Sequence, residues 1–275
     1  MTWSWQSKGQ SSSGVELRYE PGNWGDVLKG TWALFVFDEI SRSSGTSRPI
    51  RIVDPFAGAA QYPLPEVAAA RLRSLGGPFA SAQREWIDRG ELASTGRLLL
   101  ARADTEIEAH VFDTHPQRLE SWNSVEGAHR IESVESGENA LDAAERSKLG
   151  ELDLALFDPY DFFDAWSEQL PRVLDVATET PVLVYLYNKA PRAGGSARNY
   201  RSLRQRVETA GVELLVGRVP SDAVLPRAFH EMWLLWPGRI PDDLRANLVR
   251  SAKALTCKLS TSGASEWIPA GNDDS

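Results

Sequence analysis

The sequence predicts an α/β fold: a seven-stranded, mostly parallel sheet with helices on both faces and a helical insertion after the first strand. Short apolar runs rich in β-formers alternate with longer amphipathic segments, which is typical of a parallel sheet covered by helices. The last two of these short runs are joined by a short loop at residues 220–226, so the final strand is expected to run antiparallel to its neighbour.

The seven predicted strands are short runs in which apolar residues dominate. They are Arg51–Asp54, Glu108–Asp113, His129–Val134, Leu152–Phe157, Pro181–Tyr187, Val212–Val216 and Glu231–Trp236.

The predicted helices are the amphipathic segments before and between these strands. They are Gly25–Ser41, Leu64–Leu75, Ser81–Gly90, Pro116–Ser124, Ala140–Lys148, Phe162–Thr178, Arg198–Ala210 and Asp242–Leu255. The first and second strands are too far apart for a single crossover helix. We therefore expect residues 62–104 to form a helical insertion that lies over the site as a lid.

One large α/β domain accounts for most of the chain. A length of 275 residues is within reach of one large α/β unit, which we place at residues 15–258. Residues 1–14 are rich in Ser, Gly and Gln, and residues 259–275 in Ser, Gly and Asp, so both are predicted to be flexible tails.

Composition excludes several classes of protein. Hydrophobic residues at 42% and charged residues at 25% are typical of a globular protein. Cys257 is the only cysteine and no run of 18 apolar residues occurs, so we expect a cytoplasmic protein with no membrane segment. The four histidines and one cysteine have no zinc-binding spacing, so no metal is expected. A net charge of −8 argues against indiscriminate nucleic-acid binding.

The first strand ends at Asp54 and is followed by the small residues Ala57, Gly58, Ala59 and Ala60. Ligands of open α/β sheets bind at the carboxyl ends of strands, where small residues let the backbone approach them. The motif lacks a complete Gly-x-Gly-x-x-Gly, so a phosphate site is not expected. A plain tight turn explains the same residues.

The second strand ends at Asp113, where an acidic residue can accept both hydroxyls of a ribose. The alternative is a helix N-cap or an exposed carboxylate before Pro116.

The fourth strand ends in Asp158, Pro159 and Tyr160. An Asp at this place can accept a hydrogen bond from an exocyclic amine and so aim its lone pair at a methyl group, while Tyr160 can stack on an extruded base. The alternative is that Asp158 begins a turn and caps the helix at Phe162.

A basic segment follows the fifth strand. Residues 188–206 contain six Lys or Arg side chains and no acidic residue, with Tyr200 among them. This pattern fits a local surface for RNA or DNA, and it equally fits a solvated loop and helix.

Five short segments together resemble the RlmJ-type family of bacterial large-subunit ribosomal RNA adenine-N6 methyltransferases. They occur in the family's order from Pro21 to Pro269: Gly-Asn-Trp-Gly-Asp-Val-Leu-Lys at 22–29, Asp-Pro-Phe-Ala-Gly-Ala-Ala-Gln-Tyr at 54–62, Asp-Thr-His-Pro at 113–116, Asp-Pro-Tyr at 158–160 and Trp-Ile-Pro at 267–269.

The resemblance implies a class I methyltransferase fold, S-adenosylmethionine as the cofactor and an adenine N6 amine in RNA or DNA as the acceptor. Asp113 would hold the ribose, Gly58 would line the methionine side, and Asp158 with Pro159 and Tyr160 would orient the target amine. The remaining cofactor positions would be Gly30, Asp54, Phe56, Thr95, Ser136 and Gly137, and Asp158 would also border the cofactor. Lys29 would contact the substrate, and Lys189 and Arg192 of the basic segment are the further substrate contacts that we expect.

The sequence also departs from the family pattern. Gly30 and Phe56 replace histidines that approach the cofactor, Val15 and Leu17 replace a tyrosine and a histidine, and the loop after Asp158 has one proline fewer. These departures favour a second hypothesis, a binding or regulatory protein that keeps the fold without methyl transfer. A third is a methyltransferase with a small-molecule acceptor, its pocket walled by Phe56, Tyr160 and Phe162.

Overall fold

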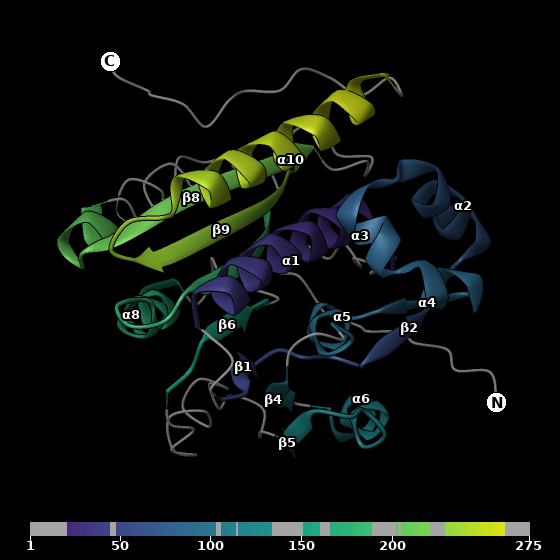
Figure 1. Cartoon of the computed structure of the whole chain (residues 1–275), viewed down its shortest axis with the longest axis horizontal. Coiled ribbons are helices and arrows are strands. Elements are labelled where there is room, and N and C mark those ends of the chain that lie inside the picture. Colours follow the sequence, from purple (N-terminus) through teal and green to yellow (C-terminus); the bar gives the residue numbers. More distant parts are fainter. Residues whose placement is uncertain are drawn as a thin grey trace.

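The computed structural model describes residues 21–44, 48–102, 106–113, 115–133, 151–159, 166–188, 202, 205–220 and 229–261. A seven-stranded sheet in the order β5-β4-β1-β6-β7-β9-β8 forms its centre (Figure 1). The strands are β1 (Ile50–Asp54), β4 (Ile107–Asp113), β5 (Ala128–Ser133), β6 (Leu154–Phe157), β7 (Val182–Asn188), β8 (Val212–Pro220) and β9 (Phe229–Pro237).

The pairing confirms the predicted sheet. Strands β5, β4, β1, β6 and β7 pair in parallel, whereas β9 is antiparallel to both β7 and β8. The strand order reverses direction at β1, between β4 and β6, so the carboxyl ends of these three strands form the edge where open α/β sheets bind ligands.

Helices cover both faces of the sheet. On one face α1 (Trp24–Ser44) and α10 (Asp242–Thr261) lie side by side, and α8 (Trp166–Ala177) packs against β7 and β9 in a separate core (Figure 1). The α1 helix is apolar on almost every side because the sheet lies beneath it while α10, α3 and α5 pack on its other sides. Trp32 and Phe37 are therefore fully buried.

The insertion after β1 contains more than helices. It runs through β2 (Gln61–Pro63), α2 (Glu66–Leu75), α3 (Gly77–Ala82), α4 (Arg84–Asp88), β3 (Glu91–Ala93) and α5 (Thr95–Leu100), and β2 pairs with β3 antiparallel. The single helix expected at Ser81–Gly90 is divided, and Gln83 lies between its parts. The fully buried Gln83 amide bonds both backbone polar groups of Ala93.

The insertion packs into the same core as α1. Its buried side chains Leu72, Phe79, Trp86 and Leu98 belong to the cluster that contains Trp32. This shared packing places the insertion against α1, beside the sheet edge. Its role as a lid stays a prediction.

Smaller differences concern helix ends. The helix expected at Pro116–Ser124 is α6 (Pro116–Leu119) followed by a 3-10 turn, Glu120–Trp122, and α10 continues to Thr261, into the segment expected as a tail. Residues 205–209 are helical, as predicted, whereas the predicted helix Ala140–Lys148 lies outside the described residues. None of the described helices combines the length and apolarity needed to cross a membrane.

Candidate functional site at the carboxyl edge of the sheet

Three carboxylates end neighbouring strands on one face of the sheet. Asp54 is paired with Val111, two residues before Asp113. On its other side Val53 is paired with Ala155, which sets Asp54 level with the residue two before Asp158. Side chains two residues apart along a strand point to the same face. Asp54, Asp113 and Asp158 therefore share the face that α1 covers.

The loop after β1 follows a path that only glycine adopts without strain. Gly58 has a φ of +61°, in the left-handed region, and a Cβ at this position would collide with the hydroxyl of Tyr62. The indole Nε1 of the fully buried Trp122 donates to the Gly58 carbonyl at 3.0 Å. Burial raises the pKa of Tyr62 to about 12, so its hydroxyl stays protonated.

Every backbone amide from Ala57 to Ala60 already donates to a group of the protein. The acceptors are, in order, the Phe112 carbonyl at 3.0 Å, Asp113 Oδ2 at 3.0 Å, the Tyr62 hydroxyl at 3.1 Å and Ser121 Oγ at 2.8 Å. A phosphate-binding loop instead turns its amides toward the ligand. The conformation of the loop is therefore fixed by the protein's own hydrogen bonds. A ligand can contact the Cα atoms of the loop, but these amides are not available to bind an anion.

Asp113 is buried, with 7% exposure, and supports this loop. Its Oδ2 accepts the Gly58 amide at 3.0 Å, its Oδ1 accepts the His115 amide at 2.7 Å, and Arg118 lies 3.7 Å away. The side chain neither caps α6, whose N-cap is His115, nor lies exposed, so both alternative interpretations of Asp113 are wrong. Each carboxylate oxygen can accept a second bond, which leaves capacity for ribose hydroxyls.

Asp54 is as buried as Asp113 but has fewer partners. Its Oδ1 accepts the Phe56 amide at 3.2 Å, and Gly96 of α5 lies beside its other oxygen, where a Cβ would come within 3.5 Å. Burial raises the pKa of Asp54 to about 7, and the neighbouring carboxylates Asp158 and Asp113 add to the effect. Thr95, the first residue of α5, is half-buried next to Gly96.

Lys29 of α1 and Asp158, which directly follows β6, form an ion pair that the sequence did not reveal. Lys29 Nζ lies 2.7 Å from Asp158 Oδ2, 3.7 Å from Asp26 and 4.9 Å from the centre of the Tyr185 ring. Burial alone would lower the pKa of Lys29, but Asp158 and Asp26 outweigh it and raise the pKa above its ordinary value. Asp158 remains 34% exposed, so its carboxylate stays accessible beside a permanent cation.

The positions of Gly30 and Phe56 have packing explanations. A Cβ on Gly30 would collide with the Phe79 ring of α3, so glycine allows α1 and α3 to approach each other. The ring of Phe56 meets Phe157 edge-on at 5.0 Å. Pro159 is buried after Asp158. A histidine at position 30 would require Phe79 to move.

Sequence reasoning missed Tyr185 and His230. The Tyr185 hydroxyl lies 2.8 Å from His230 Nδ1, and both side chains lie so close to Gly25 that a Cβ there would collide with the hydroxyl. Polar residues within the otherwise apolar β7 and β9 were the available signal. Other predicted site residues lie outside the described residues: Ser136, Gly137, Tyr160, Lys189 and Arg192.

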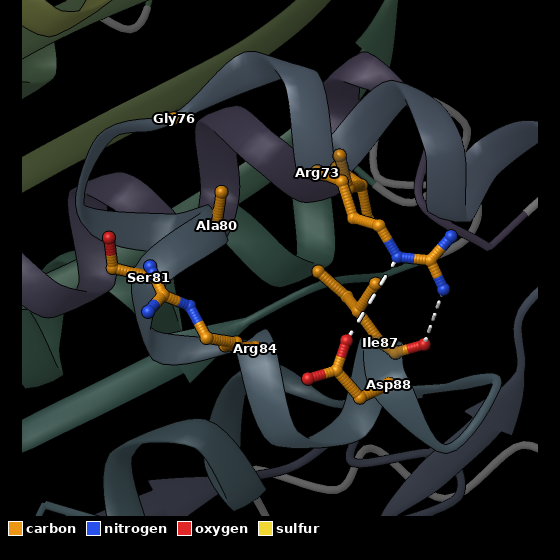
Figure 2. A pocket seen from close by; sticks show the side chains of 8 residues that line it. Arg73, Gly76, Ala80, Ser81, Arg84, Ile87 and Asp88 are labelled. Atoms are coloured by element: carbon orange, nitrogen blue, oxygen red, sulfur yellow. Dashed lines mark hydrogen bonds and ion pairs between the residues drawn. The ribbon is translucent and has the colours of Figure 1, made fainter.

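A hollow of about 250 Å³ lies elsewhere, between α2, α3 and α4 (Figure 2). Its side chains include Arg84 and Arg73, and the Arg73 guanidinium is paired with Glu66 at 3.0 Å and donates to the Ile87 carbonyl. No strand-end carboxylate lines it. Among the described residues, no group of His, Cys, Asp or Glu is placed to hold a metal ion.

The chain has the fold of class I methyltransferases. The crystal structure of protein LPL1258 from Legionella pneumophila str. Philadelphia 1 matches 88% of this chain and 93% of its own, with a TM-score of 0.63 and 9% identity. The description of that protein gives the family model DUF519. At this identity the likeness establishes the shared fold.

Two weaker likenesses are to methyltransferase domains. The METTL16 MTase domain matches with a TM-score of 0.45 and 12% identity, over 76% of this chain and 67% of its own. The bifunctional kinase-methyltransferase WbdD matches with a TM-score of 0.44 and 14% identity, over 77% of this chain and 40% of its own. No family model and no curated protein matches the sequence.

Proposed function

We propose that this chain is an S-adenosylmethionine-dependent methyltransferase that acts on an adenine N6 amine in RNA or DNA. The observation that carries the proposal is the set of carboxylates Asp54, Asp113 and Asp158, which end three adjacent strands on one face of a class I methyltransferase sheet. The family resemblance of the motifs around these residues supports the choice of acceptor.

The side chains at this edge suit the chemistry of the cofactor. S-adenosylmethionine carries a sulfonium, an ammonium and a ribose with two hydroxyls, and carboxylates are good partners for each of these groups. Asp113, oriented by Arg118 and two backbone amides, would hold the ribose, while Gly58 lets the ligand approach the backbone. When bound, the cofactor supplies an electrophilic methyl group.

The protein's contribution to transfer would be positioning. The exocyclic amine of adenine is a weak nucleophile, so its lone pair must be aimed at the methyl group. Asp158 would accept a hydrogen bond from that amine. In this structure Asp158 Oδ2 accepts from Lys29, so the lysine must share or release the carboxylate when the acceptor enters. A released Lys29 ammonium could then meet a substrate phosphate.

A second candidate function is binding without transfer. The packing of Gly30 against Phe79 favours it, because the resemblance implies a histidine that approaches the cofactor at this position. Such a protein would bind the cofactor but modify nothing.

The test is a transfer assay with methyl-labelled S-adenosylmethionine on unmodified ribosomal RNA, transfer RNA and adenine-containing DNA. We expect label on N6 of adenine, and Asp158→Asn should reduce transfer by at least about a hundredfold while leaving cofactor binding intact. Equal transfer by mutant and parent would remove Asp158 from the mechanism. Cofactor binding without transfer to any acceptor would favour the second candidate.

A further inference from the structure

The first two turns of α1 lie directly over Tyr185 of β7. Gly25 and Lys29 are four residues apart in α1, so they share one face of the helix. Gly25 lies over the Tyr185 hydroxyl, where any Cβ would collide, and Lys29 Nζ lies 4.9 Å from the centre of the Tyr185 ring. Glycine at position 25 therefore allows the helix to come this close to the ring.

The sheet places Tyr185 beside Asp158. Phe157 is paired with Val184, so the residues that follow them, Asp158 and Tyr185, are level with each other. Level residues of two paired parallel strands point to the same face of the sheet. The half-buried Tyr185 ring therefore borders the carboxylate that the proposed function assigns to the acceptor amine.

His230 of β9 fixes the orientation of the Tyr185 ring. Its Nδ1 atom shares a hydrogen bond of 2.8 Å with the Tyr185 hydroxyl, and the planes of the two rings lie at 19° to each other. His230 is only 4% exposed, so its own position is fixed by the core. A tyrosine bonded in this way at its hydroxyl keeps one ring plane.

Three groups surround the Lys29 ammonium. They are Asp158 Oδ2 at 2.7 Å, Asp26 at 3.7 Å and the face of the Tyr185 ring. The ring attracts the cation and occupies space into which the flexible lysine side chain could swing. Lys29 donates to Oδ2 of Asp158, which leaves Oδ1 to another donor.

We propose that Tyr185, anchored by His230, is a positioning residue that holds Lys29 on Oδ2 of Asp158 while Oδ1 accepts from the acceptor amine. The inference rests on the proposed function and decides how Lys29 behaves in it: the lysine shares the carboxylate and is not released. A carboxylate fixed at one oxygen presents the other in a defined direction, which aims the amine. Without the ring the ammonium spreads over several positions, and Asp158 is free to turn.

The test follows the Lys29 ammonium by NMR in the full chain with isotope-labelled lysine. Ammonium protons give a signal only where hydrogen bonds slow their exchange with water, and Lys29→Arg identifies the signal of Lys29. The parent should show this signal without any ligand. Tyr185→Leu should broaden it beyond detection, and Tyr185→Phe, which keeps the ring but loses the bond to His230, should weaken it.

Kinetics with unmodified ribosomal RNA separate positioning from binding. Tyr185→Leu should lower kcat about tenfold and leave KM for the RNA within about twofold, because the ring acts through Lys29 and Asp158. His230→Leu should lower kcat by a smaller factor. His230→Asn should restore kcat toward the parent value, because its amide can take the place of Nδ1 beside the Tyr185 hydroxyl.

Phe35→Leu is the matched control, because it removes another partly buried ring, from α1 itself, that lies outside the groups around Lys29. It should change neither the Lys29 signal nor kcat, even where it lowers stability. A parent without the Lys29 signal, or an unchanged signal or kcat in Tyr185→Leu, would overturn the role of Tyr185 and leave the proposed function standing. A folded parent that transfers no methyl group to any RNA or DNA would overturn the proposed function, and the Lys29 signal would still decide whether Tyr185 holds the lysine.

Discussion

Replacing Asp54 by Asn should stabilise the protein, and only above a particular pH. The folded chain holds Asp54 with a pKa of about 7 against an ordinary value of 3.8. Between these values the folded state binds the proton more tightly than the unfolded state, so the free energy of unfolding falls as pH rises from about 4 to about 7. Asparagine does not ionise, so the free energy of unfolding of the variant does not fall in this way.

The difference between the two pKa values corresponds to a loss of at most about 4 kcal/mol in the free energy of unfolding. Relaxation of the site makes the actual loss smaller. We expect the free energy of unfolding of Asp54→Asn to be about 2 to 4 kcal/mol higher than that of the parent near pH 8, and nearly equal to it near pH 4. Urea unfolding at a series of pH values measures this directly. Asp113→Asn should instead lose stability, because it weakens acceptors for the Gly58 and His115 amides. A gain in Asp54→Asn that is the same at every pH, or no gain, would refute the reasoning.

Three further changes test the packing of the site, each by urea unfolding. Gly58→Ala should cost about 2 kcal/mol or more, because left-handed backbone and the Tyr62 hydroxyl both oppose a Cβ, whereas Gly90→Ala, with a φ of +74° and open space, should cost only about 1 kcal/mol. Tyr62→Phe alone should lower the free energy of unfolding by about 1 kcal/mol, because the Ala59 amide loses its acceptor. In the double variant it should recover part of the Gly58→Ala loss, because the hydroxyl that collides with the new Cβ is gone. Strictly additive losses would show that the two groups do not collide. Gly30→Ala should cost about 1 to 3 kcal/mol by overpacking against Phe79, and a neutral result would show that the interface yields.

The strands could be predicted because one property, burial on both faces of the sheet, determines their sequences. Segments such as Val182–Asn188 are apolar enough to be buried on both faces, which fixes their type. The strand-end carboxylates follow from this, since parallel strands bring their carboxyl ends to one edge. The positions of Asp54, Asp113 and Asp158 at the ends of their strands are therefore enough to place these side chains together.

Other features depend on tertiary contacts that leave no local pattern. The β2 and β3 strands have three residues each, too few to show a period of two. Lys29 and Asp158 lie 129 residues apart, so their pairing requires α1 to lie over the sheet. Glycine at position 30 looked like a lost ligand in a motif, yet the Phe79 ring explains it.

The central claim is that the carboxyl edge of this sheet binds S-adenosylmethionine, and calorimetric titration of the purified chain tests it most directly. We expect binding with a Kd on the order of 1 μM, near −8 kcal/mol, weakened at least about tenfold in Asp113→Asn. A folded chain that gives no binding heat with either S-adenosylmethionine or S-adenosylhomocysteine would contradict the claim and leave a methyltransferase fold put to another use.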